Sequence, residues 1–210
     1  MPGFEDWSGR TFELVNLTDT VWKETDLVNA RFSGRIDGLV INDIEVAPLI
    51  EAELDRRFPE RLRLQVETEA DVDRAWATVE ELWAADKAIA ATLPESVLQA
   101  PLREGEWSWA ENFRHLVMVT DAWIARRALG RDDPFHPWGV PPSFMTGLPG
   151  IDTRARPAWD EIVPVRDERV AFVRAHLEGI DLECLRVVLD EEWAHHWYAT
   201  RDLDRPQSAR

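Results

Sequence analysis

The sequence predicts a mainly α-helical protein, in which a small β segment precedes a bundle of four long helices. Two observations carry this prediction. After about residue 68, apolar residues recur at the helical period of 3.6 in four long segments. Over residues 10–36 the period is five, which fits neither a helix nor a strand. We therefore expect a β segment over 4–45, a short helix and linker over 46–67, and the bundle over 68–205.

The composition narrows the class of function. The chain has 210 residues, 45% of them hydrophobic, which is enough to build a core. Its formal net charge of −16 argues against binding to nucleic acid or to an anionic membrane surface. No apolar run approaches the roughly 18 residues that a membrane span needs. We expect a cytoplasmic monomer or homodimer whose partner is a small-molecule substrate.

The period of five is carried by large apolar residues at five successive centres, Phe12, Leu17, Trp22, Leu27 and Phe32. Small or β-branched residues mostly stand two positions before each centre. This spacing fits a square coil with sides of five residues, in which each central residue points inward and stacked coils bury a column. The pattern resembles pentapeptide repeats, of which "VNLTD", "TDLVN" and "ARFSG" are good copies. The alternative is an irregular β-rich segment.

Two short elements are expected between the repeat and the bundle. The stretch "GLVINDIEV" alternates around turn residues and predicts a β-hairpin or a capping pair of strands. The stretch "PLIEAELDRRF" begins with Pro48 and has apolar residues at helical spacing, so it predicts a short helix. Pro59 is expected to end that helix.

Four amphipathic helices are predicted to form the bundle, over residues 69–92, 108–129, 158–178 and 182–203. Ser108 is the expected N-cap of the second helix, because Glu111 follows three residues later and completes a capping box. Gly130 is expected to close the second helix. Pro164 predicts that the third helix either kinks there or begins only there.

The segment 131–156 is rich in proline and glycine, yet it also carries Phe135, Trp138, Phe144 and Met145. A long connection with so many large apolar groups is expected to pack over something. We predict that it folds over the open end of the bundle and helps to wall the site. The alternative is that it only caps the core. His136, within this segment, is a weak candidate for a general acid or base.

Two pairs of possible metal ligands lie in the last predicted helix, within "DEEWAHHWY". Glu191 and His195 are four residues apart, and so are Glu192 and His196. Residues at this spacing share one helix face about 5–6 Å apart, which suits two ligands of one divalent metal. Spacing alone does not choose between the pairs, and the alternative for each is a surface ion pair between Glu and His. His115, in the second helix, is either a third ligand or a core histidine.

Other chemistries lack their motifs. The sequence holds no phosphate-binding glycine loop, no GxSxG and no CxxC. Cys184 is the only cysteine, so no intrachain disulfide can form, and its apolar neighbours predict a small buried side chain. His176 is placed to interact with the C-terminal end of the third helix.

The segments "GEWSWAENFRHLVMVTDAW" and "VVLDEEWAHHWYATRDL" resemble the DinB superfamily of four-helix metalloproteins. The resemblance covers about residues 69–203, and its most specific part is the W-S-x-x-E-x-x-x-H pattern from Trp107 to His115. It implies one divalent metal ion, of the kind Zn, Ni, Fe or Mn, bound by His115, Glu191 and His195. It thereby favours this pair over its neighbours one residue further along the helix.

The Glu-xxx-His form is similar to the mycothiol-dependent maleylpyruvate isomerase branch of that superfamily, and a repeat segment ahead of the bundle resembles an arrangement of actinobacterial members. The resemblance implies a metal-dependent enzyme acting on a small molecule, either a thiol-cofactor-dependent transferase or isomerase, with a thiol such as mycothiol, or a hydrolase. The alternatives are a non-catalytic metal- or ligand-binding bundle with an interaction surface on the β segment, and a bundle without metal.

Supporting side chains are expected around such a site. Asp121 or Asp190 could orient a ligand imidazole through its second nitrogen. Six tryptophans are expected to line or support the cavity, namely Trp76, Trp83, Trp109, Trp123, Trp193 and Trp197.

Overall fold

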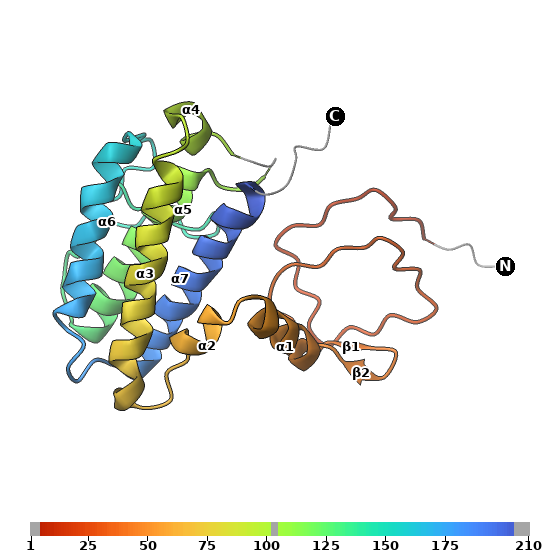
Figure 1. Cartoon of the computed structure of the whole chain (residues 1–210). Coiled ribbons are helices and arrows are strands. Elements are labelled where there is room, and N and C mark those ends of the chain that lie inside the picture. Colours follow the sequence, from red (N-terminus) through yellow and green to blue (C-terminus); the bar gives the residue numbers. More distant parts are fainter. Residues whose placement is uncertain (1–4, 102–104, 204–210) are drawn as a thin grey trace. The chain divides into compact units, whose positions relative to one another are not determined.

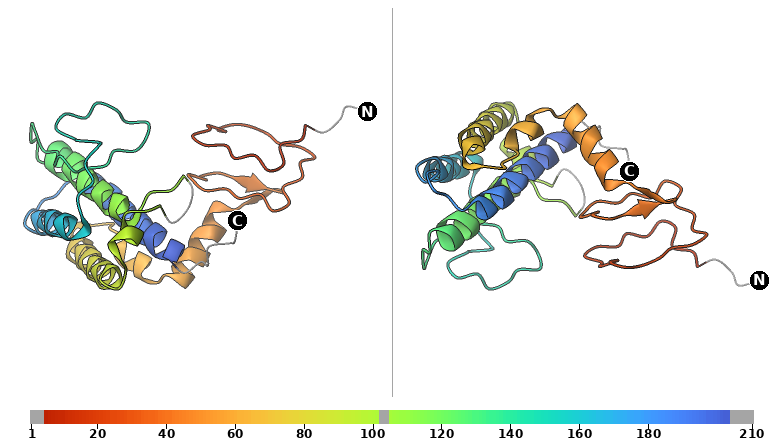
Figure 2. Two further views of the ribbon diagram at one scale, coloured as in Figure 1. Left: turned by 90° about the horizontal axis from the view of Figure 1, so that it is seen from above. Right: turned by 90° about the horizontal axis from the view of Figure 1, so that it is seen from below.

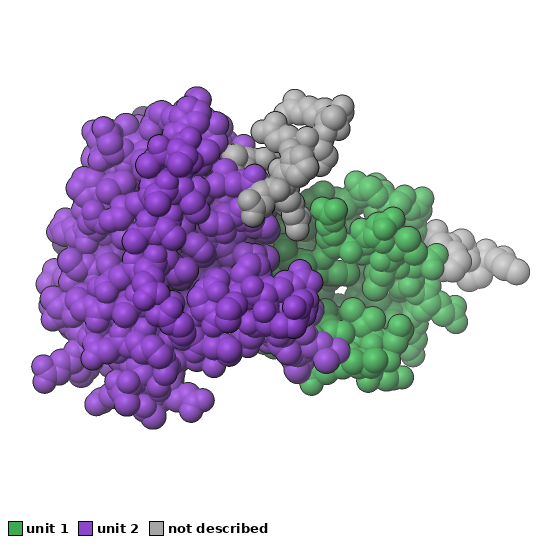
Figure 3. All heavy atoms as spheres, in the orientation of Figure 1, with its two compact units in different colours: residues 1–47 green, residues 48–210 purple. Residues whose placement is uncertain are grey.

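The computed structural model describes residues 5–101 and 105–203, and the chain divides into two compact units, residues 1–47 and 48–210 (Figures 1 and 3). The predicted mainly α fold is confirmed, because all the long helices lie in the second unit and the strands are confined to one small hairpin. Among the described residues, no helix has the length and apolar character that crossing a membrane requires.

The second unit is built from helices joined by short turns and by one long connection. After α1 (Ala47–Arg57) and α2 (Glu60–Leu64), a 3-10 turn (Glu69–Asp71) leads into α3 (Val72–Ala90). The short α4 (Glu95–Leu98) precedes α5 (Trp109–Thr120), which continues as a π-helical segment over Asp121–Ala128. The last two helices are α6 (Trp159–Arg174) and α7 (Leu182–Leu203).

Four of these helices, α3, α5, α6 and α7, form the predicted bundle (Figures 1 and 2). Their apolar faces meet in one core, because each helix repeats apolar residues at the helical period. The fully buried members include Trp76, Val79, Phe113, Leu116, Ile162, Val173, Leu185 and Leu189. Cys184 is buried in this core as expected.

The N-terminal end of α5 is fixed by the predicted capping box. The backbone N–H of Glu111 donates to Ser108 Oγ at 3.1 Å, and the backbone N–H of Ser108 donates to Glu111 Oε2 at 3.0 Å. Two backbone donors of the first turn are thereby satisfied. The helix consequently begins at Trp109, which sets the rotation of the face that carries His115.

The third helix of the bundle, α6, begins at Trp159 and continues through Pro164, so the prediction that it could start at the proline is wrong. The helix also ends at Arg174, four residues before the predicted end. His176 lies just beyond, with its Nδ1 2.7 Å from the carbonyl oxygen of Phe172 in the last turn. The histidine therefore interacts with the end of α6 as predicted.

The predicted β-hairpin of the first unit is present. Strands β1 (Val40–Ile41) and β2 (Ile44–Glu45) are antiparallel, and Ile41 pairs with Ile44. The turn residues Asn42 and Asp43 have φ values of 49° and 63°. Two positive φ angles define the turn that suits the twist of a hairpin, and Asn and Asp tolerate them well.

The five-residue rhythm of the first unit reappears in its backbone, because Leu14, Asp19, Glu24 and Asn29 all have positive φ. The expected burial of the large central residues is wrong, since the five centres from 12 to 32 are 45–61% exposed. A coil with four five-residue sides takes 20 residues per turn, so residues 10–36 would complete little more than one turn of it. A single turn has no neighbour stacked on it to cover its central side chains.

Candidate metal centre

Three predicted ligands from two helices come together in the second unit. Nε2 of His195 lies 3.2 Å from Glu191 Oε2, and Nε2 of His115 lies 3.5 Å from the same oxygen. The three donor atoms all lie within 4.8 Å of one another. Two imidazole nitrogens and a carboxylate oxygen that converge in this way form a donor set that divalent metals accept.

Each imidazole of this triad is held through its other nitrogen. His115 Nδ1 lies 2.7 Å from the carbonyl oxygen of Val140, and His195 Nδ1 lies 2.7 Å from Asn112 Oδ1. Both partners are acceptors, so each Nδ1 carries the hydrogen and donates it. The Nε2 lone pairs are then left pointing toward Glu191, which is the tautomer that a metal ligand needs.

The burial of the two histidines and the charge of Glu191 are also compatible with a bound cation. Both histidines are buried, whereas Glu191 is 37% exposed and forms the side of the triad that is open to solvent. The adjacent rings of His115 and His195 hold the pKa of Glu191 down, at about 2. Burial lowers the pKa of His195. At neutral pH the site therefore offers an ionised carboxylate and a neutral imidazole of His195, and both are competent ligands.

The neighbouring pair on α7, Glu192 and His196, binds residues of other helices. Glu192 is buried and forms an ion pair with Arg166 of α6. His196 Nδ1 lies 2.7 Å from a carboxylate oxygen of Asp86 of α3. Glu192 and His196 thus face the helices packed against α7, which leaves Glu191 and His195 as the pair that faces His115.

A family model described as the DinB superfamily matches residues 72–198. This match spans more than half of the chain and includes all three residues of the triad. The chain belongs to the DinB superfamily. No curated protein sequence and no solved structure gives a significant match.

An aromatic wall that the sequence analysis missed lies against the triad of this DinB-superfamily chain. The ring centroid of Trp107 lies 4.6 Å from that of His115 and 5.5 Å from that of His195. The planes of the Trp107 and His195 rings are stacked, at an angle of 18°. None of the six tryptophans predicted to line the site makes such a contact with these two histidines within the described part of the chain. Trp107 was identifiable as the first residue of the W-S-x-x-E-x-x-x-H pattern.

The predicted orienting residues also need correction. Asp121 binds Arg169 at 2.6 Å and the backbone N–H of His136 at 2.8 Å, and Asp190 is an exposed side chain. The residue that orients the imidazole of His195 through its second nitrogen is instead Asn112. It precedes His115 by three residues on α5, which places it on the same face of the helix and within reach of α7.

His136, the weak catalytic candidate, is not part of the triad. Its ring lies against Trp138, and its Nδ1 accepts the backbone N–H of Trp138 at 3.2 Å. The backbone N–H of His136 binds Asp121, so this residue anchors the connection rather than the site.

The connection over 131–156 runs along α5 and does not fold over the end of the bundle as predicted (Figure 2). Arg114 Nε donates to the carbonyl oxygen of Trp138 at 2.8 Å, and a Cβ at Gly139 would come within 3.1 Å of Met118 Cβ. Glycine thus permits the close approach that brings the Val140 carbonyl to His115. Phe144 and Met145 are exposed, contrary to expectation, while Phe135 is buried.

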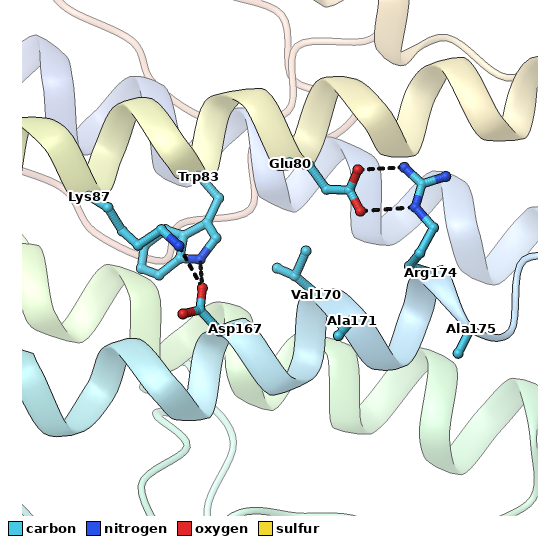
Figure 4. Close-up of a pocket in the computed structure, with 8 residues that line it drawn as sticks. All are labelled: Glu80, Trp83, Lys87, Asp167, Val170, Ala171, Arg174 and Ala175. Atoms are coloured by element: carbon cyan, nitrogen blue, oxygen red, sulfur yellow. Dashed lines mark hydrogen bonds and ion pairs between the residues drawn. The ribbon is translucent and has the colours of Figure 1, made fainter.

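A cleft of about 360 Å³ lies between α3 and α6, away from the triad (Figure 4). Ion pairs from Lys87 to Asp167 and from Arg174 to Glu80 cross it. None of its eight lining residues belongs to the triad, so this cleft is not the candidate metal centre.

We expect Asn112→Ala to weaken metal binding by about 10- to 100-fold, because the substitution frees His195 Nδ1 from its acceptor. Asn112→Asp is the matched control, since it keeps an acceptor oxygen in place and is expected to preserve the affinity. Competition titration with a chromophoric chelator measures both variants. Equal affinities of Asn112→Ala and the wild type would show that the contact has no role in binding.

Proposed function

We propose that this chain binds one divalent metal ion through His115 Nε2, His195 Nε2 and the Glu191 carboxylate, and acts with it on a small molecule. The observation that carries the proposal is the paired Nδ1 bonding, which aims both Nε2 atoms at one ionised carboxylate. An ordinary surface Glu–His pair does not need two independently fixed imidazoles. Zn, Ni, Fe and Mn all accept this donor set.

The residues of the site would have separate roles in binding the metal, holding its ligands and covering them. Three protein ligands leave an open coordination position, as in catalytic metal sites. A metal bound there supplies Lewis acidity and lowers the pKa of a thiol or a water. Asn112 and the Val140 carbonyl hold the two imidazoles, while Trp107 covers both rings. Glu191 is the exposed member of the triad, so a substrate would approach from its side.

The reaction class that we favour is a thiol-cofactor-dependent transfer or isomerisation, with hydrolysis second. The Glu-xxx-His ligand pattern, which is similar to the mycothiol-dependent branch, supports the first. The test is to load the protein with Co²⁺ and add mycothiol or cysteine. A sulfur-to-cobalt charge-transfer absorption that is absent in His195→Ala is expected. Its absence in the wild type would leave hydrolysis as the better proposal.

A non-catalytic metal- or ligand-binding role is the second candidate. The observation in its favour concerns two clefts, the one of about 360 Å³ between α3 and α6 and a second of about 260 Å³ between Glu111 and residues 139–156 of the connection. Neither has a residue of the triad in its lining. In this case the first unit would serve as an interaction surface, and its five-residue period would be that of a short pentapeptide-repeat segment. Tight metal binding without any thiol or anion binding to the metal would favour this role.

The connection over 131–156 is expected to support ligand binding through Val140. Replacing residues 134–146 with a Gly/Ser linker removes the packing that presents the Val140 carbonyl to His115. We expect a folded protein with weaker binding of small ligands to the metal-loaded site, measured by calorimetric titration. A variant that melts at a lower temperature with ligand binding intact would show that the connection only covers the core.

A further inference from the structure

Tyr198 is the only tyrosine of the chain, and it lies beside the triad. It follows His195 by three residues and Glu191 by seven on α7, so all three share one face of the helix. Its ring contacts the ring of His195 edge-on, with 5.8 Å between the centroids.

The ring of Tyr198 is fixed while its hydroxyl is left for another molecule. Trp197 packs at 5.4 Å between ring centroids, and the guanidinium of Arg201 lies 5.1 Å from the centre of the Tyr198 ring. Over residues 5–101 and 105–203, the hydroxyl makes no hydrogen bond to the protein. A half-buried phenol held in this way, next to the exposed carboxylate of Glu191, is a preorganised donor.

We propose that Tyr198 is a substrate-binding residue of the metal centre, whose hydroxyl donates a hydrogen bond to a carboxylate or carbonyl oxygen of the small molecule bound there. The inference rests on the proposed function, because it requires a metal ion on the triad. Oxygen is named as the acceptor because sulfur accepts hydrogen bonds only weakly. Because the acceptor is a carboxylate or carbonyl oxygen, the substrate class is a small organic acid or carbonyl compound. Trp107 presents a flat apolar face on the same two histidines.

The experiment compares wild-type protein and Tyr198→Phe, both loaded with Co²⁺, in titrations with two probes. Acetate can bind the metal with one oxygen and accept from Tyr198 with the other. Imidazole binds the metal through nitrogen and offers only a donor at its far side. We expect acetate to bind roughly tenfold more weakly to Tyr198→Phe, which is the loss of one hydrogen bond. Imidazole is expected to bind both proteins equally.

A second measurement uses the single tyrosine. Protein labelled with ¹³C on the tyrosine ring gives signals from Tyr198 alone, and acetate is expected to shift them in the Zn²⁺-loaded wild type but not in His195→Ala. This readout does not depend on catalysis or on a substitution at Tyr198.

The outcomes separate this inference from the proposed function. If Co²⁺ does not bind the wild type, the proposed function fails. If Co²⁺ binds but acetate has equal affinity for both proteins and leaves the ¹³C signals in place, the inference about Tyr198 fails alone. If Tyr198→Phe weakens binding of Co²⁺ itself, Tyr198 is a metal ligand, and its assignment as a substrate donor is overturned.

Discussion

Replacing Glu192 with alanine is expected to lower the free energy of unfolding by about 3–5 kcal/mol. Its partner Arg166 is 0% exposed and bonds Glu192 through Nη2 alone, while Nε and Nη1 of that guanidinium have no hydrogen-bond partner among the described residues. Removing Glu192 would leave the buried guanidinium of Arg166 without its ion-pair partner. Such a loss is large compared with the stability of a typical domain.

The matched control is Glu183→Ala on the same helix. Glu183 also pairs with an arginine, Arg127, at 3.6 Å, but it is 76% exposed. Solvent screens that pair, so its loss is expected to cost less than about 1 kcal/mol. Urea unfolding followed by circular dichroism measures both variants. The double variant Arg166→Met/Glu192→Leu is expected to be more stable than Glu192→Ala, because it removes both charges. Equal losses for Glu192→Ala and Glu183→Ala would contradict this account.

The second large effect concerns the two adjacent histidines of α7. His195→Ala is expected to weaken binding of Zn²⁺, Ni²⁺ or Mn²⁺ by more than about 100-fold, because losing a ligand costs more than losing an orienting partner. His196→Ala is expected to leave the affinity nearly intact. It is expected instead to lower stability by about 1–3 kcal/mol, because the buried Asp86 loses its hydrogen-bond partner.

Calorimetric titration of metal-free protein, at a temperature where both variants are folded, separates these two effects. An equal loss of metal affinity in both variants, or a loss only in His196→Ala, would move the site to Glu192 and His196. That result would also contradict the orientation of α7 in the structure, in which Glu192 faces Arg166.

The elements that the sequence predicted well are those fixed by local chemistry. Helix α7 has the predicted bounds of 182–203, and α5 begins where the Ser108 capping box requires it. The turn at Asn42 and Asp43 is likewise specified by residues that tolerate positive φ. Apolar periodicity over four segments then suffices to predict a bundle.

The features that could not be predicted depend on contacts between distant segments. Asn112 reaches His195 across 83 positions, and the Val140 carbonyl meets His115 across 25 positions. A backbone carbonyl leaves no signature in a sequence at all. The pairing of Glu192 with Arg166 likewise follows from the packing of α6 on α7, and periodicity alone left the two Glu–His pairs equivalent.

In the first unit, the sequence predicted the backbone period but not the exposure of the central side chains. Its five-residue rhythm was evident from the sequence, and the backbone repeats it, but burial of the central side chains needs a second coil. Periodicity predicts the conformation of a repeat, whereas the number of repeats decides whether a core can form.

The most direct test of the central claim is the metal content of the purified protein, measured by elemental analysis for the wild type and for His195→Ala. We expect one divalent ion per wild-type chain and its loss in the variant. Added Zn²⁺, Ni²⁺ or Mn²⁺ should also raise the melting temperature of the metal-free wild type, because a ligand of the native state stabilises it. A wild-type protein without stoichiometric metal, whose melting temperature none of these ions changes, would contradict the assignment of His115, Glu191 and His195 as a metal centre.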